Sequence, residues 1–236
     1  MSSEPAALMS ATFHEAGYAH LVELVHQKDA GARRQLASLR VEAYDAAGVR
    51  HLDTRLDPRQ EILDLEALLG EACRAHGRLL VVFDARYDPA IFPYRPHHYA
   101  YLQRRGSAAP PLYYAVNATL GGVPDRIGSV ALNNFESYLF LDRPVTERYA
   151  LALGNLSRFA TAEAQVISYY AGVRRTEEVR LPPKAHTELA LAPAHDGHRL
   201  GRVELKALFR LTSYVVGRRP REDALVLFDH LFTYFK

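Results

Sequence analysis

The stretch that decides the fold is "YDAAGVRHLDTRLDP", Tyr44 to Pro58, because a second copy of it follows far along the chain as "YYAGVRRTEEVRLPP", Tyr169 to Pro183. Both copies contain AGVR, which begins at Ala47 and again at Ala171, a spacing of 171 − 47 = 124 residues. Solenoid repeats have much shorter periods of about 20–50 residues. A spacing of 124 residues is the size of a domain. The repeat predicts two tandem copies of one domain, residues 1–122 and residues 123–236.

The residues before each AGVR alternate between apolar and polar side chains, in "SLRVEAYDA" (38–46) and in "EAQVISYYA" (163–171). Alternation with a period of two is typical of a half-buried strand. In each copy a glycine, a second short extended run and a proline follow, as at the end of an edge strand. Many short strands separated by Gly and Pro turns favour antiparallel sandwiches. The predicted fold is all-β, with two tandem antiparallel β-sandwich domains from an internal duplication.

Three further segments have a predicted conformation. In "QEILDLEALLGEACRAHG" (60–77) the apolar residues stand at helical spacing, which predicts a short helix in the first domain. The segment "LYYAVNATL" (112–120) alternates throughout and predicts one strand. The aromatic and apolar C-terminus "ALVLFDHLFTYFK" (224–236) predicts a strand in the centre of its sheet.

The hairpin and its closing proline resemble a segment of the sensory rhodopsin transducer family, in which a similar hairpin ends in a proline followed by basic residues. The matching residues are Arg55, Leu56, Pro58 and Arg59 in the first copy and Tyr169, Tyr170, Arg180, Leu181, Pro183, Lys184 and His186 in the second. The resemblance implies a small, non-enzymatic, oligomeric β-sandwich that acts as an adaptor. It implies no functional residue for this chain, which carries two copies where the family has one.

The amino-acid composition indicates a globular protein and argues against some classes of partner. Of the 236 residues 48% are hydrophobic and 24% charged, which are values of globular chains. A formal net charge of +2 is too small to imply a nucleic acid or a membrane as partner. The single cysteine, Cys73, excludes an intramolecular disulfide and fits a cytoplasmic protein. The sequence shows neither a signal peptide nor a membrane-spanning run, so a cytoplasmic location is expected.

The sequence shows no known catalytic or metal-binding motif. In "HEAGYAH" (14–20) the histidines are six residues apart, whereas the helical zinc motif needs four. The pairs in "HDGH" (195–198) and at 97–98 are better explained as surface histidines in turns. A Gly-x-Ser-x-Gly elbow is absent, and Cys73 lies on the apolar face of the predicted helix, where a thiol is usually buried and inert. We therefore predict no catalytic residue, no metal ligand and no cofactor.

One segment, Tyr87 to Tyr114, combines tyrosines, arginines, a histidine pair and prolines, and its counterpart in the second copy lacks the histidine pair. Tyrosine and arginine are enriched in interaction surfaces, and prolines lower the entropy cost of presenting a loop. The candidate ligand-binding residues are Tyr94, Arg95, His97, His98, Tyr99, Tyr101 and Arg104. The alternative is a long loop that packs its aromatic rings between the two domains.

The first functional hypothesis is a non-catalytic binding or scaffolding protein, oligomeric or with an unknown protein partner. A second hypothesis is a metal-assisted or hydrolytic enzyme with its site around His97, Tyr99 and Arg104. A third hypothesis is the binding of a glycan or an anion by the tyrosines and the arginine pairs.

Overall fold

A computed structural model of the chain describes residues 6–24, 36–57, 60–87, 98–108, 110–120, 133–140, 148–170, 173–191, 200–207, 209, 211–219 and 224–230. These residues form four antiparallel sheets and one short helix. The predicted all-β fold class is confirmed. The chain divides into two compact units, of which unit 1 comprises Met1–Gly106 and Pro111–Gly121, and unit 2 comprises Ser107–Pro110 and Gly122–Lys236.

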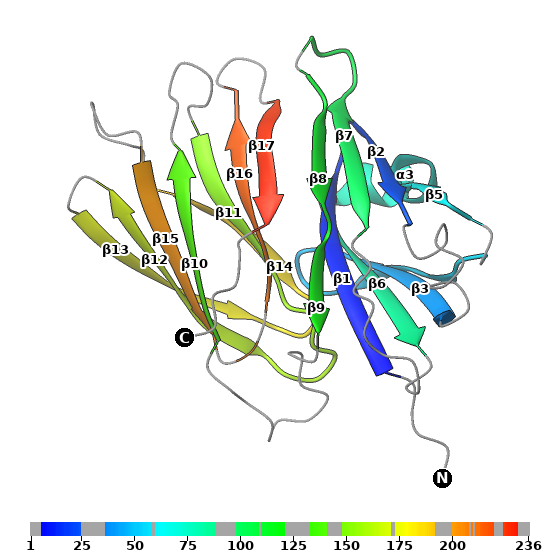
Figure 1. Cartoon of the computed structure of the whole chain (residues 1–236), viewed down its shortest axis with the longest axis horizontal. Coiled ribbons are helices and arrows are strands. Elements are labelled where there is room, and N and C mark those ends of the chain that lie inside the picture. Colours follow the sequence, from blue (N-terminus) through cyan, green and yellow to red (C-terminus); the bar gives the residue numbers. More distant parts are fainter. Residues whose placement is uncertain are drawn as a thin grey trace. The chain divides into compact units, whose positions relative to one another are not determined.

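Unit 1, coloured blue to green in Figure 1, contains two sheets and the helix. Sheet A has the strand order β4-β3-β6-β1-β9, and sheet B has the order β5-β2-β7-β8. The elements are β1 (Ala6–Glu15), β2 (Tyr18–Glu23), β3 (Leu36–Tyr44), β4 (Arg50–Arg55), β5 (Ile62–Asp64), α3 (Leu65–His76), β6 (Arg78–Tyr87), β7 (Tyr99–Arg104), β8 (Leu112–Ala115) and β9 (Asn117–Leu120).

Unit 2 also contains two sheets. Sheet C has the strand order β10-β15-β12-β13, and sheet D has the order β14-β11-β16-β17. The strands are β10 (Asn133–Phe140), β11 (Arg148–Gly154), β12 (Ala162–Tyr170), β13 (Val173–Leu181), β14 (His186–Ala190), β15 (Leu200–Ala207), β16 (Thr212–Arg218) and β17 (Leu225–His230).

The two units have the same strand order. If β1 to β8 are matched in sequence order with β10 to β17, the first four strands of sheet A correspond to sheet C, and sheet B corresponds to sheet D. Unit 1 differs in the described residues by the helix α3 between β5 and β6 and by the additional edge strand β9.

In each unit the two sheets enclose a core. In unit 1 the Thr12 hydroxyl on sheet A hydrogen-bonds to the Tyr114 hydroxyl on sheet B at 2.6 Å, which shows that these faces meet inside the sandwich. In unit 2 one apolar cluster contains residues of both sheets, among them Val166 and Leu205 of sheet C and Leu151 and Val215 of sheet D. Burial of such side chains stabilises the fold by about 25 cal/mol for each Å² of apolar surface.

The predicted helix is confirmed as α3, although Ile62 belongs to β5 and is exposed. The helix begins after Asp64, whose carboxylate accepts a hydrogen bond from the backbone N–H of Ala67 at 3.0 Å, as an N-cap does. It ends at Gly77, whose φ of 75° lies in the region that glycine adopts most easily. Between the two caps, Leu65, Leu69 and Cys73 form the buried side of the helix.

Two strand predictions were wrong in detail. Residues 112–120 form two strands rather than one, because the chain passes at Val116 from β8 in sheet B to β9 in sheet A. The C-terminal strand β17 pairs with β16 alone among the described residues and is an edge strand of sheet D, not a central one. The apolar residues of β17 are explained by the burial of one face of the strand, and an edge strand can have a buried face just as a central strand does.

Candidate functional site

Of the seven candidate ligand-binding residues, Tyr94, Arg95 and His97 lie outside the described residues. The other four lie on or next to β7, on opposite faces of sheet B. His98 is 1% exposed and its ring packs against Phe83 at 5.1 Å between centroids, inside the sandwich. Arg104 is on the same side of β7 as the buried residues, whereas Tyr99 and Tyr101 are on the outward side. The structure therefore brings the two tyrosines together and separates them from His98.

The outward side of sheet B is unusually rich in apolar and aromatic residues. A solvated sheet face normally carries polar side chains. Here the exposed fractions are 37% for Leu21, 55% for Ile62, 38% for Tyr99 and 65% for Tyr113. We refer to this surface as the tyrosine face, formed by Leu21, Glu23, Ile62, Tyr99, Tyr101, Gln103 and Tyr113.

Strand pairing fixes the geometry of the tyrosine face. Tyr101 stands opposite Tyr113 on β8 and opposite Leu21 on β2. The rings of Tyr99 and Tyr113 stack with their centroids 5.8 Å apart and an interplanar angle of 4°. The Tyr113 hydroxyl donates to Glu23 Oε2 at 3.4 Å, and the Tyr101 hydroxyl donates to Gln103 Oε1 at 2.7 Å. These contacts hold Tyr99 and Tyr113 parallel to each other, while Glu23 stands between Ile62 and Tyr99 in the strand register.

Leu21, Glu23 and Ile62 were not among the predicted binding residues, because they lie on strands remote in sequence from the tyrosines. The apolar residues at the outward positions of "ILD" (62–64) and "YAHLVE" (18–23) could have indicated an apolar surface. However, the sequence does not predict that these two strands lie next to β7 in one sheet. Only the sheet order β5-β2-β7-β8 places them on the same face.

The interior of unit 1 contains a chain of polar side chains. The Tyr114 hydroxyl bonds to Thr12 and also lies 2.9 Å from His20 Nε2. The His20 ring lies 5.5 Å from the His14 ring. Burial lowers the pKa of His14 to about 4, although Glu66, Asp64 and Glu15 act in the opposite direction. Burial, and secondly the nearby His14, lower the pKa of His20 well below its usual value. Both imidazoles are therefore neutral at pH 7.

Cys73 is buried, as predicted. Burial raises the pKa of its thiol to about 12, with a further contribution from Glu15. Its Sγ donates a hydrogen bond to the backbone carbonyl oxygen of His14 at 3.4 Å. A thiol that remains protonated is a poor nucleophile, so Cys73 has a structural role.

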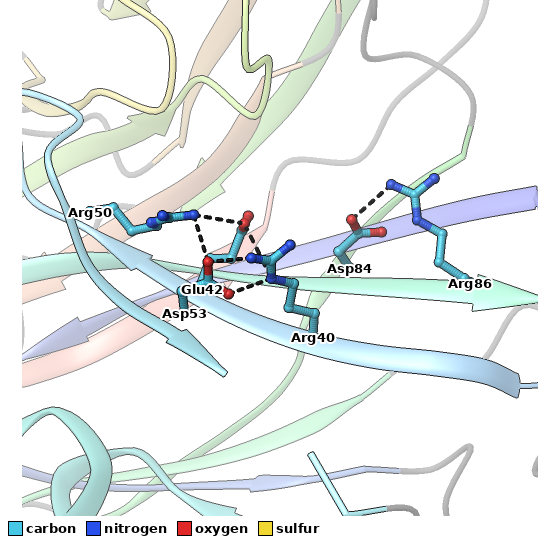
Figure 2. A network of polar contacts seen from close by, with 6 residues as sticks. All are labelled: Arg40, Glu42, Arg50, Asp53, Asp84 and Arg86. Atoms are coloured by element: carbon cyan, nitrogen blue, oxygen red, sulfur yellow. Dashed lines mark hydrogen bonds and ion pairs between the residues drawn. The ribbon is translucent and has the colours of Figure 1, made fainter. Parts of the chain in front are cut away.

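Six charged residues lie on β3, β4 and β6 of sheet A, on the side opposite the core of unit 1, as Figure 2 shows. Arg40 bonds to Asp53, and Arg50 Nη1 lies 2.6 Å from Asp53 Oδ2. Both guanidinium groups also approach Glu42, which is 2% exposed, at 3.7 and 3.9 Å. The remaining pair is Arg86 and Asp84, 2.9 Å apart. Arg40, Glu42, Arg50 and Asp53 tie β3 to β4, whereas the Asp84–Arg86 pair lies within β6. Three cations and three carboxylates balance, so these residues leave no net charge for an ionic ligand.

Unit 2 carries an open groove of about 540 Å³ on strands β12, β13 and β15. It is lined by Glu163, Ala164, Gln165, Glu178, Val179, Arg180, Lys206 and Ala207. Two acidic and two basic side chains line the groove, which gives it no preference for ligands of either charge. Its residues share none of the exposed aromatic character of the tyrosine face.

Comparison with known proteins gives no family for this chain. No protein-family description matches it, and no curated protein is significantly similar in sequence. One similar solved structure is the apo form of Pleurotus ostreatus lectin, at 9% identity and a TM-score of 0.21, with 99% of this chain and 75% of the lectin chain covered. We draw no conclusion from a similarity at that score. Among the described residues, no helix is long and apolar enough to cross a membrane.

Proposed function

We propose that this chain is a non-catalytic binding protein that associates through the tyrosine face, and that its partner on this face is a second copy of the chain. The observation that carries the proposal is the exposed, parallel pair Tyr99 and Tyr113 beside the exposed Leu21 and Ile62. Exposed apolar patches are found at interaction sites more often than elsewhere on protein surfaces.

The chemistry of the tyrosine face favours a protein surface as the occupant. Leu21 and Ile62 offer no hydrogen bond, and their exposure costs free energy in a monomer. A second copy presents a face of the same composition, and a two-fold axis would pair the exposed apolar and aromatic residues of one face with those of the other. Tyrosines in such a position bury a large area while each hydroxyl keeps a polar partner.

The arrangement of β7 supports a binding role rather than catalysis in the 87–114 segment. His98 and Tyr99 are neighbours in sequence, but His98 is in the core and Tyr99 faces outward. The two side chains therefore cannot act on the same substrate. Tyr99 and Tyr101 also stand on the outward side of sheet B, where Tyr99 is 38% exposed, whereas acid–base catalysis is most effective in a pocket that excludes water.

The test is sedimentation equilibrium over a concentration series, with four proteins compared. We expect the wild type to associate, and the single variants Tyr99→Ser and Tyr113→Ser to raise the dimer dissociation constant at least about tenfold, which corresponds to about 1.4 kcal/mol. Phe159→Ser is the matched control, because Phe159 in unit 2 is a 63% exposed aromatic residue outside the tyrosine face. A wild type that stays monomeric at the highest concentration refutes self-association.

A glycan is the second candidate ligand, favoured by one observation. The parallel rings of Tyr99 and Tyr113 lie next to the Glu23 carboxylate, which combines a flat aromatic surface with a hydrogen-bond acceptor. Substitution of Ile62 by Ser separates the two candidates, because it weakens a protein interface and leaves stacking on the tyrosines intact. A glycan array with the wild type and Tyr113→Ser gives the direct test.

We also infer that the chain arose by internal duplication. The support is the common strand order of the two units together with the repeated AGVR hairpin. The similarity of that hairpin to the sensory rhodopsin transducer family stays a prediction.

A further inference from the structure

Three residues that are distant in sequence from the tyrosine face meet at one end of unit 1. Asp45 follows the last residue of β3, His51 is on β4, and His76 is the last residue of α3. Asp45 Oδ2 lies 3.0 Å from His51 Nε2 and 3.8 Å from His76 Nδ1. All three potential ligand atoms lie within 4.8 Å of one another. The imidazole rings of His51 and His76 are 4.2 Å apart between centroids.

The carboxylate of Asp45 is held in place by the hairpin turn. Its Oδ1 accepts hydrogen bonds from the backbone N–H groups of Ala47 at 2.9 Å and Val49 at 3.0 Å. The turn closes with a bond from the Gly48 N–H to the Asp45 carbonyl oxygen, and Gly48 has a φ of 85°. With Oδ1 engaged by the backbone, Oδ2 is directed at the two histidines. The carboxylate is therefore oriented before any ligand arrives.

The two histidines approach Oδ2 from different elements. His51 extends from the strand that follows the turn, and His76 extends from the C-terminal turn of α3, where backbone carbonyl groups favour a positive charge. The side chains of His51 and His76 are 22% and 36% exposed, so solvent ions can reach the cluster. Asp45 itself is buried, with 9% exposed.

We propose that Asp45, His51 and His76 bind a first-row transition-metal dication of the Zn²⁺ type, through Asp45 Oδ2, His51 Nε2 and His76 Nδ1. Two imidazole nitrogens and one carboxylate oxygen are a ligand set that Zn²⁺ and Fe²⁺ accept. Tetrahedral bonds of about 2.0–2.1 Å place ligand atoms about 3.3–3.4 Å apart. The observed distances of 3.0 and 3.8 Å bracket that value. Three protein ligands leave a position for water or another ligand on the exposed side.

The second copy of the hairpin does not carry this ligand set. At the spacing of 124 residues between the two AGVR stretches, His51 corresponds to Arg175, which carries a positive charge and does not bind a metal dication. The helix α3 that carries His76 has no counterpart among the described residues of unit 2. The site is therefore specific to unit 1, and to the helix α3 that unit 2 lacks among its described residues. The metal would link the β3–β4 hairpin to the C-terminal end of α3.

The test uses the full chain, freed of metal with a chelator and titrated with Zn²⁺ by calorimetry and with Co²⁺ by visible absorption. The wild type is expected to bind one Zn²⁺ at this site, and Zn²⁺ is expected to raise its melting temperature. His76→Ala and Asp45→Asn are expected to weaken binding at least about tenfold. His76→Ala removes a partly exposed side chain, and Asp45→Asn keeps an oxygen that can accept from Ala47 and Val49, so we expect both variants to retain the fold.

The matched control replaces His195 and His198, a second histidine pair near an aspartate, by alanine in one double variant. This control is expected to bind Zn²⁺ with the affinity of the wild type. The proposal is overturned if the wild type binds no Zn²⁺ at micromolar concentration, since the cluster is then held by hydrogen bonds alone. It is equally overturned if His76→Ala binds as tightly as the wild type while the double variant does not.

Discussion

Acidification is expected to destabilise unit 1 through the buried histidines His14 and His20, which are 1% and 0% exposed. In the folded chain the pKa of His14 is about 4, and that of His20 is also far below 6.5, in both cases because burial disfavours the charged imidazolium. In the unfolded chain both side chains return to the ordinary value of 6.5. Unfolding therefore takes up protons below that pH.

The sign and the size follow from proton linkage. Because the folded-state pKa is lowered, the stability contributed by each neutral histidine is complete above pH 6.5 and is lost as the pH falls toward 4. Between about pH 7.5 and pH 5 the loss through His14 is about 2 kcal/mol, and His20 adds a loss of the same sign. Domains have a free energy of unfolding of about 5–15 kcal/mol, so this loss is a large part of the total. The nearby carboxylates of Glu66, Asp64 and Glu15 raise the pKa of His14, and the value of about 4 results from burial and these carboxylates together.

The assay is urea unfolding followed by circular dichroism at a series of pH values. His14→Leu and His20→Leu are each expected to reduce the slope of unfolding free energy against pH by up to about 1.4 kcal/mol per pH unit. Tyr114→Phe is the matched control, because it removes a hydroxyl bonded to Thr12 and His20 but no group that titrates between about pH 5 and pH 7.5. It should lower stability by about 1–3 kcal/mol at every pH, which also identifies the transition of unit 1. The reasoning is refuted if the double variant His14→Leu/His20→Leu has the same slope of unfolding free energy against pH as the wild type.

Two further predictions concern stability. Asn155→Ala is expected to cost about 2–3 kcal/mol, because the fully buried Asn155 amide donates to the backbone carbonyl groups of Ala160, Leu181 and Pro182. The exposed Gln165→Ala, which removes a hydrogen bond to Glu178, should stay within about 0.5 kcal/mol in the same denaturation assay. Gly77→Ala should destabilise by about 1–2 kcal/mol, since Gly77 has a positive φ of 75°. Gly70→Ala inside α3 should stabilise by up to about 1 kcal/mol, and thermal melts that show the same sign for both glycine variants contradict this explanation.

The local features of the fold could be predicted because their signals are local. The alternation in 38–46 and 163–171 predicted strands, and residues 38–44 and 163–170 lie in β3 and β12. The helical spacing in 60–77 predicted α3. The crossing of the chain at Val116 from sheet B to sheet A could not be predicted, since the alternation of apolar side chains continues through it. The edge position of β17 could not be predicted either, because its apolar residues are equally compatible with a central strand and with an edge strand that has one buried face.

The candidate sites depend on contacts between residues far apart in the chain. The sequence indicated Tyr99 and Tyr101 as binding residues but gave no reason to separate them from His98. Their separation follows from the two faces of one strand. The cluster of Asp45, His51 and His76 follows no known ligand spacing, because His76 reaches it from the end of a helix that begins 20 residues after Asp45, at Leu65.

By itself the sequence determined that the chain folds into strands, that one hairpin occurs twice at a domain-sized spacing, and that a single helix interrupts the first copy. These properties depend on the period of apolar side chains and on glycine and proline, which act within a few residues. The tertiary structure alone decided that Tyr99 stacks on Tyr113, that Leu21 and Ile62 join them, and that Asp45 faces two histidines. The physical reason is that strand order and sheet packing bring distant segments together, and no local pattern in the chain encodes that choice.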